Sequence, residues 1–463
     1  MLKPVEQKAL KLKDNSPRDI PRETKATLAT LKRFAGLTLN EWREKWPDVI
    51  VIPERLSGIG KGSYDDSDRM PVFWLDEECY RISTGNCMGV FRLREKGGGT
   101  PVQVEITSRF DEGKQQFFLN YLLSKVFGGS LMGPVAGGGD DLWDMLLAFI
   151  FRHRLQEASA VGLFKQFRTF QRNDIRVRGR IDVARHLRRN TPFLGSVAYA
   201  THEITFDNST NHLLRHAWAK VQQKWLAAAV GGVRLTEMQH QLEQNTPTWR
   251  RSDVLECIRH KENQTPIKQP YFQAHYEPLR RVALALLRHE GASLYQREQE
   301  AEGVIFDGSW LWEEYVWTLL REIEGFHHPR NKEQTGRWST PPGVTFYPDF
   351  FHRDKRVVLD AKYRRPLADQ DEERSQPIAT QVFAYMFLLD AVHGGIINPE
   401  GNGTHSPSEI TRQMRVEDRD AKKAWWHALA LEPPRDLANA SAFKTEMEER
   451  EKAFKKEVKK IMA

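Results

Sequence analysis

The stretch YPDFFHRDKRVVLDAKYRRP, residues 347–366, places charged side chains inside two short apolar runs that have the character of β-strands. The runs VTFYPDFF and RVVLDAKY each carry an acid, Asp349 or Asp360, where a buried strand usually carries valine or leucine. Lys362 follows Asp360 by two residues, so strand alternation directs both side chains to the same face. This segment therefore predicts two acids and an ammonium group on one sheet.

A hairpin that turns at Asp354 and Lys355 would place Asp349 directly opposite Asp360. Paired Cβ atoms lie about 5 Å apart, and like charges at that separation are destabilising. A cation would relieve the repulsion, and a set of few hard oxygen ligands suits Mg²⁺ or Mn²⁺. Such a metal activates water, while a lysine orients that water or stabilises developing charge on the phosphorus centre. The alternative is a solvent-exposed hairpin with an incidental Asp–Lys pair.

Helices predicted on either side of the hairpin add further polar residues. The preceding segment LWEEYV offers Glu313, and the following segment QVFAY carries Gln381 and Tyr385 on one helical face. This Gln–Tyr pair could position a phosphate or a water, or it could be a core tyrosine beside a glutamine. The segment GGIINP then reads as a strand. Helix, hairpin, helix and strand in this order predict an α/β unit with a mixed sheet.

Residues 310–399 resemble the PD-(D/E)XK nuclease superfamily through LWEEYV, YPDF, LDAKY, QVFAY and GGIINP. The resemblance implies a catalytic set of Asp349, Asp360, Lys362, Glu313, Gln381 and Tyr385. It also implies that Asp349, Asp360 and Glu313 bind Mg²⁺ (or Mn²⁺). The D-x-K triplet here replaces the commoner E-x-K form, which the superfamily allows.

The bulk composition is that of a soluble protein. The chain has 463 residues, 40% of them hydrophobic and 28% charged, which suits roughly three domains of about 150 residues. No apolar run approaches the roughly 20 residues needed to span a bilayer, and the N-terminus lacks the apolar core of a secretory signal. Three cysteines without C-x-x-C spacing argue against a disulfide framework and a zinc finger. We expect a cytoplasmic protein with no membrane association.

Positive charge is concentrated in residues 165–189, within a chain of net charge +7. Arginine dominates this segment, and its planar guanidinium suits phosphate recognition. The alternatives are a protein interface or a solvated helix face. Arg364 and Arg365, directly after the D-x-K triplet, could steer phosphate toward the metal. The predicted DNA-binding residues are Arg176, Arg178, Arg180, Arg188, Arg189, Arg364 and Arg365.

Composition shifts divide the chain into four parts. We expect a basic N-terminal arm, or loosely docked helices, over residues 1–45 and a small strand-rich domain, possibly partner-binding, over 46–135. A mostly helical middle domain should cover 136–292, with segment 165–189 as an irregular or β insertion. The nuclease domain should cover 293–463 and end in a charged helix on the surface or bound to a partner. The overall class expected is α/β, or α+β for the chain as a whole.

The segment SGIGKGS, residues 57–63, does not complete a phosphate-binding loop. Arg55 occupies the position of the first glycine, and Gly62 follows Lys61 where serine or threonine is required. A flexible loop is the better interpretation, so we do not expect this chain to hydrolyse a nucleotide.

The segments VRGRIDVARHLRRN and DNSTNHLLRHAW, at residues 177–190 and 207–218, are similar to McrC-like nuclease subunits of modification-dependent (McrBC-type) restriction systems. The likeness covers roughly residues 85–400. It implies a DNA endonuclease subunit for antiviral defence that works with a separate AAA+ GTPase, which is McrB-like. Two alternatives remain: a DNA-binding adaptor that stimulates a partner NTPase with a weak or unused nuclease site, and a stand-alone DNA repair nuclease.

Overall fold

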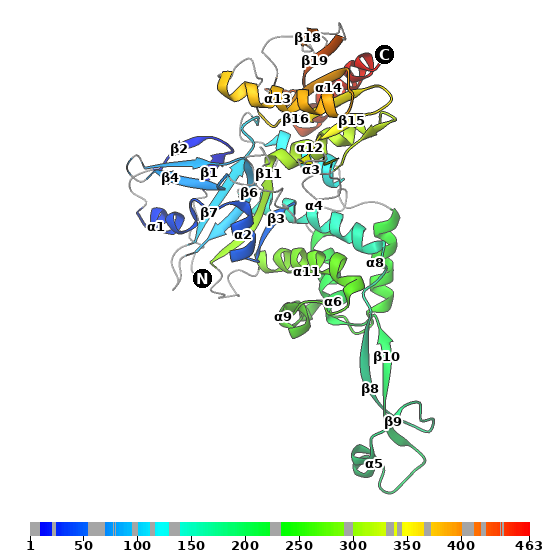
Figure 1. The fold of residues 1–463 in the computed structure, drawn as a ribbon. Coiled ribbons are helices and arrows are strands. Elements are labelled where there is room, and N and C mark those ends of the chain that lie inside the picture. The colour runs from blue at the N-terminus through cyan, green and yellow to red at the C-terminus, as the bar shows by residue number, and fades with distance from the viewer. Residues whose placement is uncertain are drawn as a thin grey trace. The chain divides into compact units, whose positions relative to one another are not determined.

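The protein has a mixed α/β architecture in the computed structural model, as the sequence predicts (Figure 1). Two compact units are formed, one by residues 1–149 with 297–463 and the other by residues 150–296. We describe each unit separately. The structure describes residues 10–20, 25–53, 70–76, 78, 80–94, 101–111, 116–128, 139–222, 233–290, 300–329, 338–339, 345–364, 372–400, 412–417, 423–435, 437 and 439–463.

A five-stranded sheet organises the N-terminal part of the first unit. Its order is β1-β7-β6-β11-β3, with β6 antiparallel to both neighbours. The strands are β1 (Leu10–Lys13), β7 (Val102–Thr107), β6 (Cys87–Leu93), β11 (Ala301–Asp307) and β3 (Val49–Ile52). Because β11 lies between β6 and β3, residues 301–307 belong to this sheet, although composition alone placed them in the nuclease domain.

Of the two expectations for the first 45 residues, residues 25–45 form docked helices rather than a mobile arm. Strand β1 pairs in parallel with β7, and helices α1 (Lys25–Phe34) and α2 (Leu39–Lys45) pack on the sheet region. Phe34 and Trp42 are fully buried, and the Trp42 ring lies 5.1 Å from that of Phe91. The lysine-rich composition gave no indication of this core, which is formed by a few apolar residues at helical spacing. A second, three-stranded sheet has the order β2 (Pro17–Asp19), β5 (Arg81–Thr84) and β4 (Phe73–Asp76).

The C-terminal part of the first unit contains a six-stranded mixed sheet in the order β12-β15-β16-β17-β19-β18. Strands β15 and β16 are antiparallel, whereas β16, β17 and β19 run parallel. The predicted order of helix, hairpin, helix and strand is confirmed. The elements are α12 (Gly308–Leu320), β12 (Phe326–His327), β13 (Trp338–Ser339), β14 (Thr345–Phe346), β15 (Phe350–His352), β16 (Val357–Ala361), α13 (Glu372–Leu388), β17 (His393–Asn398), β18 (Arg412–Glu417) and β19 (Lys423–Ala430).

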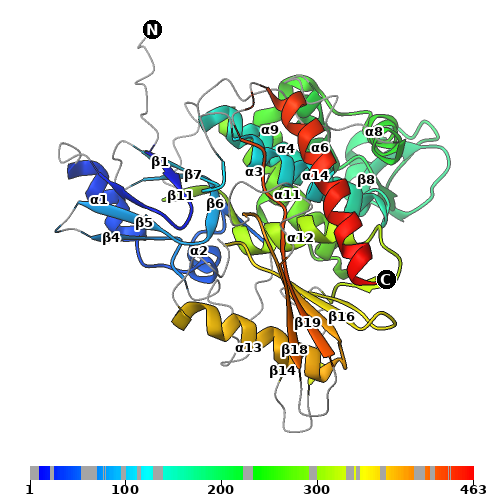
Figure 2. The same ribbon diagram turned by 90° about the horizontal axis from the view of Figure 1, so that it is seen from above.

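Helix α13 covers one face of this sheet, and Figure 2 shows it beside the strands. Val382 and Met386 pack against Val358 and Ile396 of β16 and β17. Gly394 in β17 permits the close approach, since a Cβ atom there would lie 2.1 Å from the Met386 sulfur. This packing fixes the face of α13 that carries the Gln–Tyr pair.

The charged C-terminal helix, α14 (Ala440–Ile461), is built into the first unit. It packs on α12 and α3 (Phe117–Phe127), with Glu451 buried among polar groups of both. Its remaining buried residues include Phe443, Met447, Phe454 and Val458. Apart from Glu451, its lysines and glutamates are exposed or partly exposed, so α14 lies on the surface of the first unit with one face built into it.

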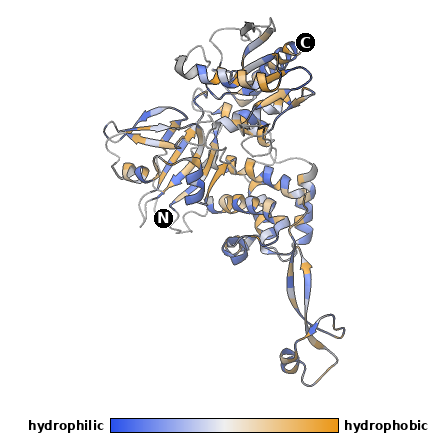
Figure 3. Ribbon diagram, viewed as in Figure 1, coloured by the Kyte–Doolittle hydropathy of each residue, from blue (hydrophilic) through white to orange (hydrophobic). Residues whose placement is uncertain are grey.

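The second unit is a helical cluster from which a long β-hairpin extends (Figure 1). Strands β8 (Gln166–Asp174) and β10 (Val197–Thr205) pair from Gln166↔Thr205 to Asp174↔Val197. The basic segment thus forms the predicted β insertion, completed by β9 (Arg180–Ile181) and helix α5 (Val183–Arg189). Figure 3 shows both hydrophobic and hydrophilic residues on helix α11. The helices are α6 (Ser209–Val221), α8 (Val233–Asn245), η3 (Arg251–Asp253), α9 (Val254–Arg259), α10 (Lys261–Gln264) and α11 (Pro270–Glu290), and α4 (Gly139–Ser159) crosses from the first unit.

Two sequence features lie outside the described residues: the SGIGKGS segment and Arg365. Among the described helices, none is both long enough and apolar enough to cross a membrane.

Candidate active site

The predicted hairpin register is confirmed. Strands β15 and β16 pair as Phe350↔Leu359, Phe351↔Val358 and His352↔Val357. The turn between them closes with a hydrogen bond from Arg356 N to Arg353 O of 3.0 Å. Continuing this register by one residue places Asp349, which directly precedes β15, across from Asp360.

Asp360 and Lys362 form a close ion pair at the end of β16. Asp360 is 1% exposed, and its Oδ2 lies 2.7 Å from Lys362 Nζ. The amide of Lys362 donates to Ile397 O at 2.9 Å, which extends the parallel pairing past the end of the strand. Within the described residues, Asp360 Oδ2 accepts no hydrogen bond of suitable geometry. A buried carboxylate oxygen held only by an ion pair is costly unless a further cation or donor reaches it.

Asp349 is half-buried and lies near two other acidic residues, Asp360 and Glu313. Its Oδ2 accepts a hydrogen bond from Ala361 N at 2.8 Å, which ties it to β16. Burial, followed by repulsion from Asp360 and Glu313, raises the pKa of Asp349 well above its usual value, while Lys362 opposes this shift. The site therefore holds more negative charge than it neutralises by itself, which favours a bound cation.

His328 is a site residue that sequence reasoning missed. Its side chain is fully buried, with Nδ1 2.9 Å from the carbonyl oxygen of Asp349 and Nε2 3.3 Å from Glu314 Oε1. Nδ1 also lies 3.9 Å from Glu313 Oε1 on helix α12. His328 therefore connects the helical acids with the backbone at Asp349. The segment HHPR gives no spacing signal for this role, because only the folded chain brings these elements together.

Gln381 and Tyr385 form the pair predicted from their spacing. Gln381 Nε2 donates to the Tyr385 hydroxyl at 2.7 Å. Tyr385 is buried, and burial together with Asp360 and Asp349 raises the pKa of its phenol. The structure thus brings the Gln–Tyr pair to the side of the two acids, with the phenol kept neutral.

A divalent cation fits this donor set. Mg²⁺ commonly takes one or two carboxylates and completes its shell with water and phosphate oxygens. Asp349 and Asp360 supply such a pair, and Asp360 Oδ2 contacts Lys362 Nζ without a hydrogen bond of suitable geometry, which leaves it available to a bound cation. In the described parts of the chain, no three His, Cys, Asp or Glu residues form a complete metal cage. The role of Glu313 as a third ligand stays a prediction.

The predicted DNA-binding arginines lie in two places. Arg364 directly follows the site, and its amide donates to Lys362 O at 2.8 Å. The group of five, Arg176, Arg178, Arg180, Arg188 and Arg189, lies at the far end of the β8–β10 hairpin. That hairpin end also exposes the apolar residues Ile175, Leu187, Phe193 and Leu194. Arginines beside exposed apolar groups are typical of protein interfaces, which favours that alternative for the hairpin end.

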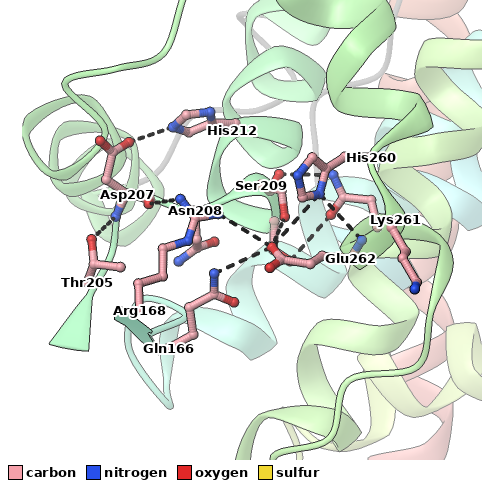
Figure 4. Close-up of polar contacts among 12 residues, drawn as sticks. Gln166, Arg168, Thr205, Asp207, Asn208, Ser209, His212, His260, Lys261 and Glu262 are labelled. Carbon is pink, nitrogen blue, oxygen red and sulfur yellow. Dashed lines mark hydrogen bonds and ion pairs between the residues drawn. The ribbon is translucent and has the colours of Figure 1, made fainter. Parts of the chain in front are cut away.

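A polar network anchors the base of this hairpin on its helices (Figure 4). Glu262 accepts a hydrogen bond from Ser209 Oγ at 2.6 Å and lies 3.6 Å from Arg168 Nη2 of β8. Asn208 and Asn211, from the DNSTN segment, both donate to the carbonyl oxygens of Phe164 and Phe206. The structural role of these conspicuous asparagines accounts for their presence.

The chain is similar to known proteins both in sequence and in fold. No curated protein matches the chain. Among solved structures, the chain is similar to one from a half-complex of a tetradecameric assembly of Thermococcus gammatolerans McrB AAA+ hexamers with bound McrC. The identity is 15%, the TM-score is 0.52, and the match covers 98% of this chain and 100% of that one. A second match, to the Thermococcus gammatolerans McrBC complex, has 15% identity and a TM-score of 0.31. It covers 68% of this chain and 87% of that one. The family model described as McrBC 5-methylcytosine restriction system component matches residues 82–399, more than half of the chain, and the protein belongs to that family.

Proposed function

We propose that this protein is a metal-dependent DNA endonuclease, the cleavage subunit of its restriction system. The observation that carries the proposal is the acid pair Asp349–Asp360 with Lys362 at one end of β16. Family membership supports a role in restriction, and the excess negative charge of the site supports a cation-dependent reaction.

In this proposal Asp349 and Asp360 hold Mg²⁺ or Mn²⁺, with Glu313 as an additional ligand. The bound ion would supply charge stabilisation at the phosphate and a water of lowered pKa. Lys362 Nζ, held beside Asp360, donates to the attacking water or to a phosphate oxygen. The Tyr385 hydroxyl, fixed by Gln381, offers a second donor on the same side. Hydrolysis then adds the water oxygen to phosphorus and releases the deoxyribose oxygen as the leaving group.

We further propose that the protein works with a separate AAA+ GTPase. The related assembly contains AAA+ hexamers with bound McrC, and the present sequence lacks a completed phosphate-binding loop. The pair Arg364–Arg365 remains the proposed contact to DNA phosphates. For the hairpin arginines, DNA contact stays a prediction, and the exposed apolar residues beside them favour a protein interface.

Cleavage of a methylated plasmid by the purified protein, in the presence of an McrB-like AAA+ protein, GTP and Mg²⁺, tests this function. Asp360→Ala and Lys362→Ala should each abolish cutting while the fold is retained. Asp354→Ala is the matched control, since this exposed acid lies in the turn of the same hairpin and should leave cutting unchanged.

Normal cutting by both site variants would refute the assignment. GTP turnover by the partner, measured with Asp360→Ala, distinguishes the adaptor alternative from the proposed nuclease. If wild-type protein stimulates turnover but never cuts under any metal, the adaptor function replaces the proposal. Cutting that needs no partner and no methylation would favour a repair nuclease.

A further inference from the structure

We propose that Arg109, held by Asp14, is a positioning residue for Lys362. The inference rests on the proposed nuclease function. It connects the five-stranded N-terminal sheet to the reactive end of β16, two parts of the first unit that composition alone assigned to different domains.

The contact passes through Tyr363, the residue directly after Lys362. Tyr363 is buried, and its hydroxyl shares a 2.6 Å hydrogen bond with Ser108 Oγ. Arg109 Nη2 donates to the backbone carbonyl of Tyr363, and the guanidinium carbon lies 5.0 Å from the centre of the Tyr363 ring. Both the side chain and the main chain of Tyr363 are therefore fixed by the loop that follows β7.

Asp14 fixes the arginine in turn. Asp14 follows β1 and is fully buried, and its Oδ2 lies 3.1 Å from Arg109 Nη1. Its Oδ1 accepts a hydrogen bond from the amide of Arg109. A guanidinium can bridge a carboxylate and a carbonyl at fixed geometry because its donors form a rigid planar fork, whereas a lysine carries rotatable donors on a flexible stem. The Asp14–Arg109 pair is thus a stiff link between the β1–β7 edge and Tyr363.

Lys362 needs such a link because it lies just past the end of β16, whose last residue is Ala361. Its amide makes one bond, to Ile397, beyond the ladder of the strand. The Lys362 ammonium must stay 2.7 Å from Asp360 on a flexible four-carbon stem. Movement of the Tyr363 backbone would move the base of that stem. Groups that orient a reactive residue in this way typically alter activity about 10- to 100-fold when removed.

Arg109 is partly buried and could instead serve only to join two sheets, so the control must separate that role. Arg92 provides the comparison: it is a buried arginine on β6 of the five-stranded sheet, and its Nη1 lies 3.3 Å from Glu302 Oε1 of β11. That ion pair lies within the sheet, on the β6–β11 side rather than toward Tyr363. Arg92→Lys therefore perturbs the same sheet without a change at the Tyr363 carbonyl.

The experiment compares kcat and KM for Mg²⁺-dependent cleavage by Arg109→Lys and Arg92→Lys, with melting temperatures measured alongside. We expect Arg109→Lys to lower kcat about 10- to 100-fold with KM for DNA unchanged, and Arg92→Lys to keep wild-type kcat. Wild-type kcat in folded Arg109→Lys, or equal losses in both variants, would overturn the inference. If Arg109→Lys does not fold, Asp14→Asn replaces it with the same two readings.

Lys362→Ala separates this inference from the function on which it rests. Cleavage by Lys362→Ala at the wild-type rate would refute the nuclease site itself. Loss of cleavage in Lys362→Ala, with wild-type kcat in Arg109→Lys, would refute only the positioning role.

Discussion

Glu451 of helix α14 should be among the most sensitive residues of the first unit to substitution. This buried carboxylate accepts hydrogen bonds from the hydroxyls of Tyr121 at 2.6 Å and Tyr315 at 2.9 Å, and from Lys125 Nζ at 2.8 Å. The two tyrosines lie on α3 and α12, so one side chain joins three helices. Replacement by alanine leaves two hydroxyls without their acceptor and opens a cavity among aromatic rings.

The expected magnitude follows from those three contacts. Hydrogen bonds to a charged group contribute about 1.5–3 kcal/mol each, and removing one partner of a buried ionic cluster typically costs about 3–5 kcal/mol in total. We therefore expect Glu451→Ala to destabilise the first unit by about 3–5 kcal/mol. At about 2–4 °C per kcal/mol for a unit of this size, its melting temperature should fall by about 10 °C.

Thermal unfolding followed by circular dichroism measures this effect. The control is Glu448→Ala on the same helix, because the side chains of Glu448 and its partner Lys444 are 43% and 49% exposed and lie 3.8 Å apart. An exposed pair of this kind is worth about 0–1 kcal/mol, so the control should melt near wild type. Equal melting temperatures for the two variants would refute the account of α14 as a buried structural helix.

Two further predictions concern the site and its support. His328→Ala should lower cleavage while DNA binding persists, because the Asp349 carbonyl loses its 2.9 Å contact with Nδ1; His352→Ala is a useful comparison, since that buried histidine contacts Glu324 O instead, and equal losses would contradict a specific role. Burial raises the pKa of Asp14 to about 6. An unfolded aspartate has a pKa of about 3.9, so the native state binds the proton more tightly and this group's contribution to stability falls as pH rises from about 4 to about 6. The stability of Asp14→Asn relative to wild type should therefore increase with pH across this window, as urea unfolding at several pH values would show; a constant difference would contradict the raised pKa.

Local sequence patterns predicted the β15–β16 hairpin and helix α13 well. Strand alternation and a short turn determine the β15–β16 register, so the amino-acid sequence alone suffices to place Asp349 and Asp360 opposite each other. Helical spacing likewise predicted that Gln381 and Tyr385 share one face of α13, where the structure joins them by a hydrogen bond.

Local patterns did not predict the contacts between segments that lie far apart in the sequence. Strand β11 joins β6 across more than two hundred residues of sequence, and no local signal selects that partner. Arg109, Asp14 and His328 gain their roles only when distant segments meet, since each is an ordinary residue in its own neighbourhood. Charge-rich composition also concealed the buried faces of α1, α2 and α14, where a few apolar residues at helical spacing outweigh many lysines and glutamates.

The central claim is that Asp349 and Asp360 together hold a divalent cation for DNA cleavage. Calorimetric titration of Mn²⁺ into the wild-type protein, Asp349→Asn, Asp360→Asn and the turn control Asp354→Asn tests it directly. We predict one site in the wild type and in Asp354→Asn, and its loss in both site variants. Unchanged Mn²⁺ binding by Asp349→Asn and Asp360→Asn would contradict the claim.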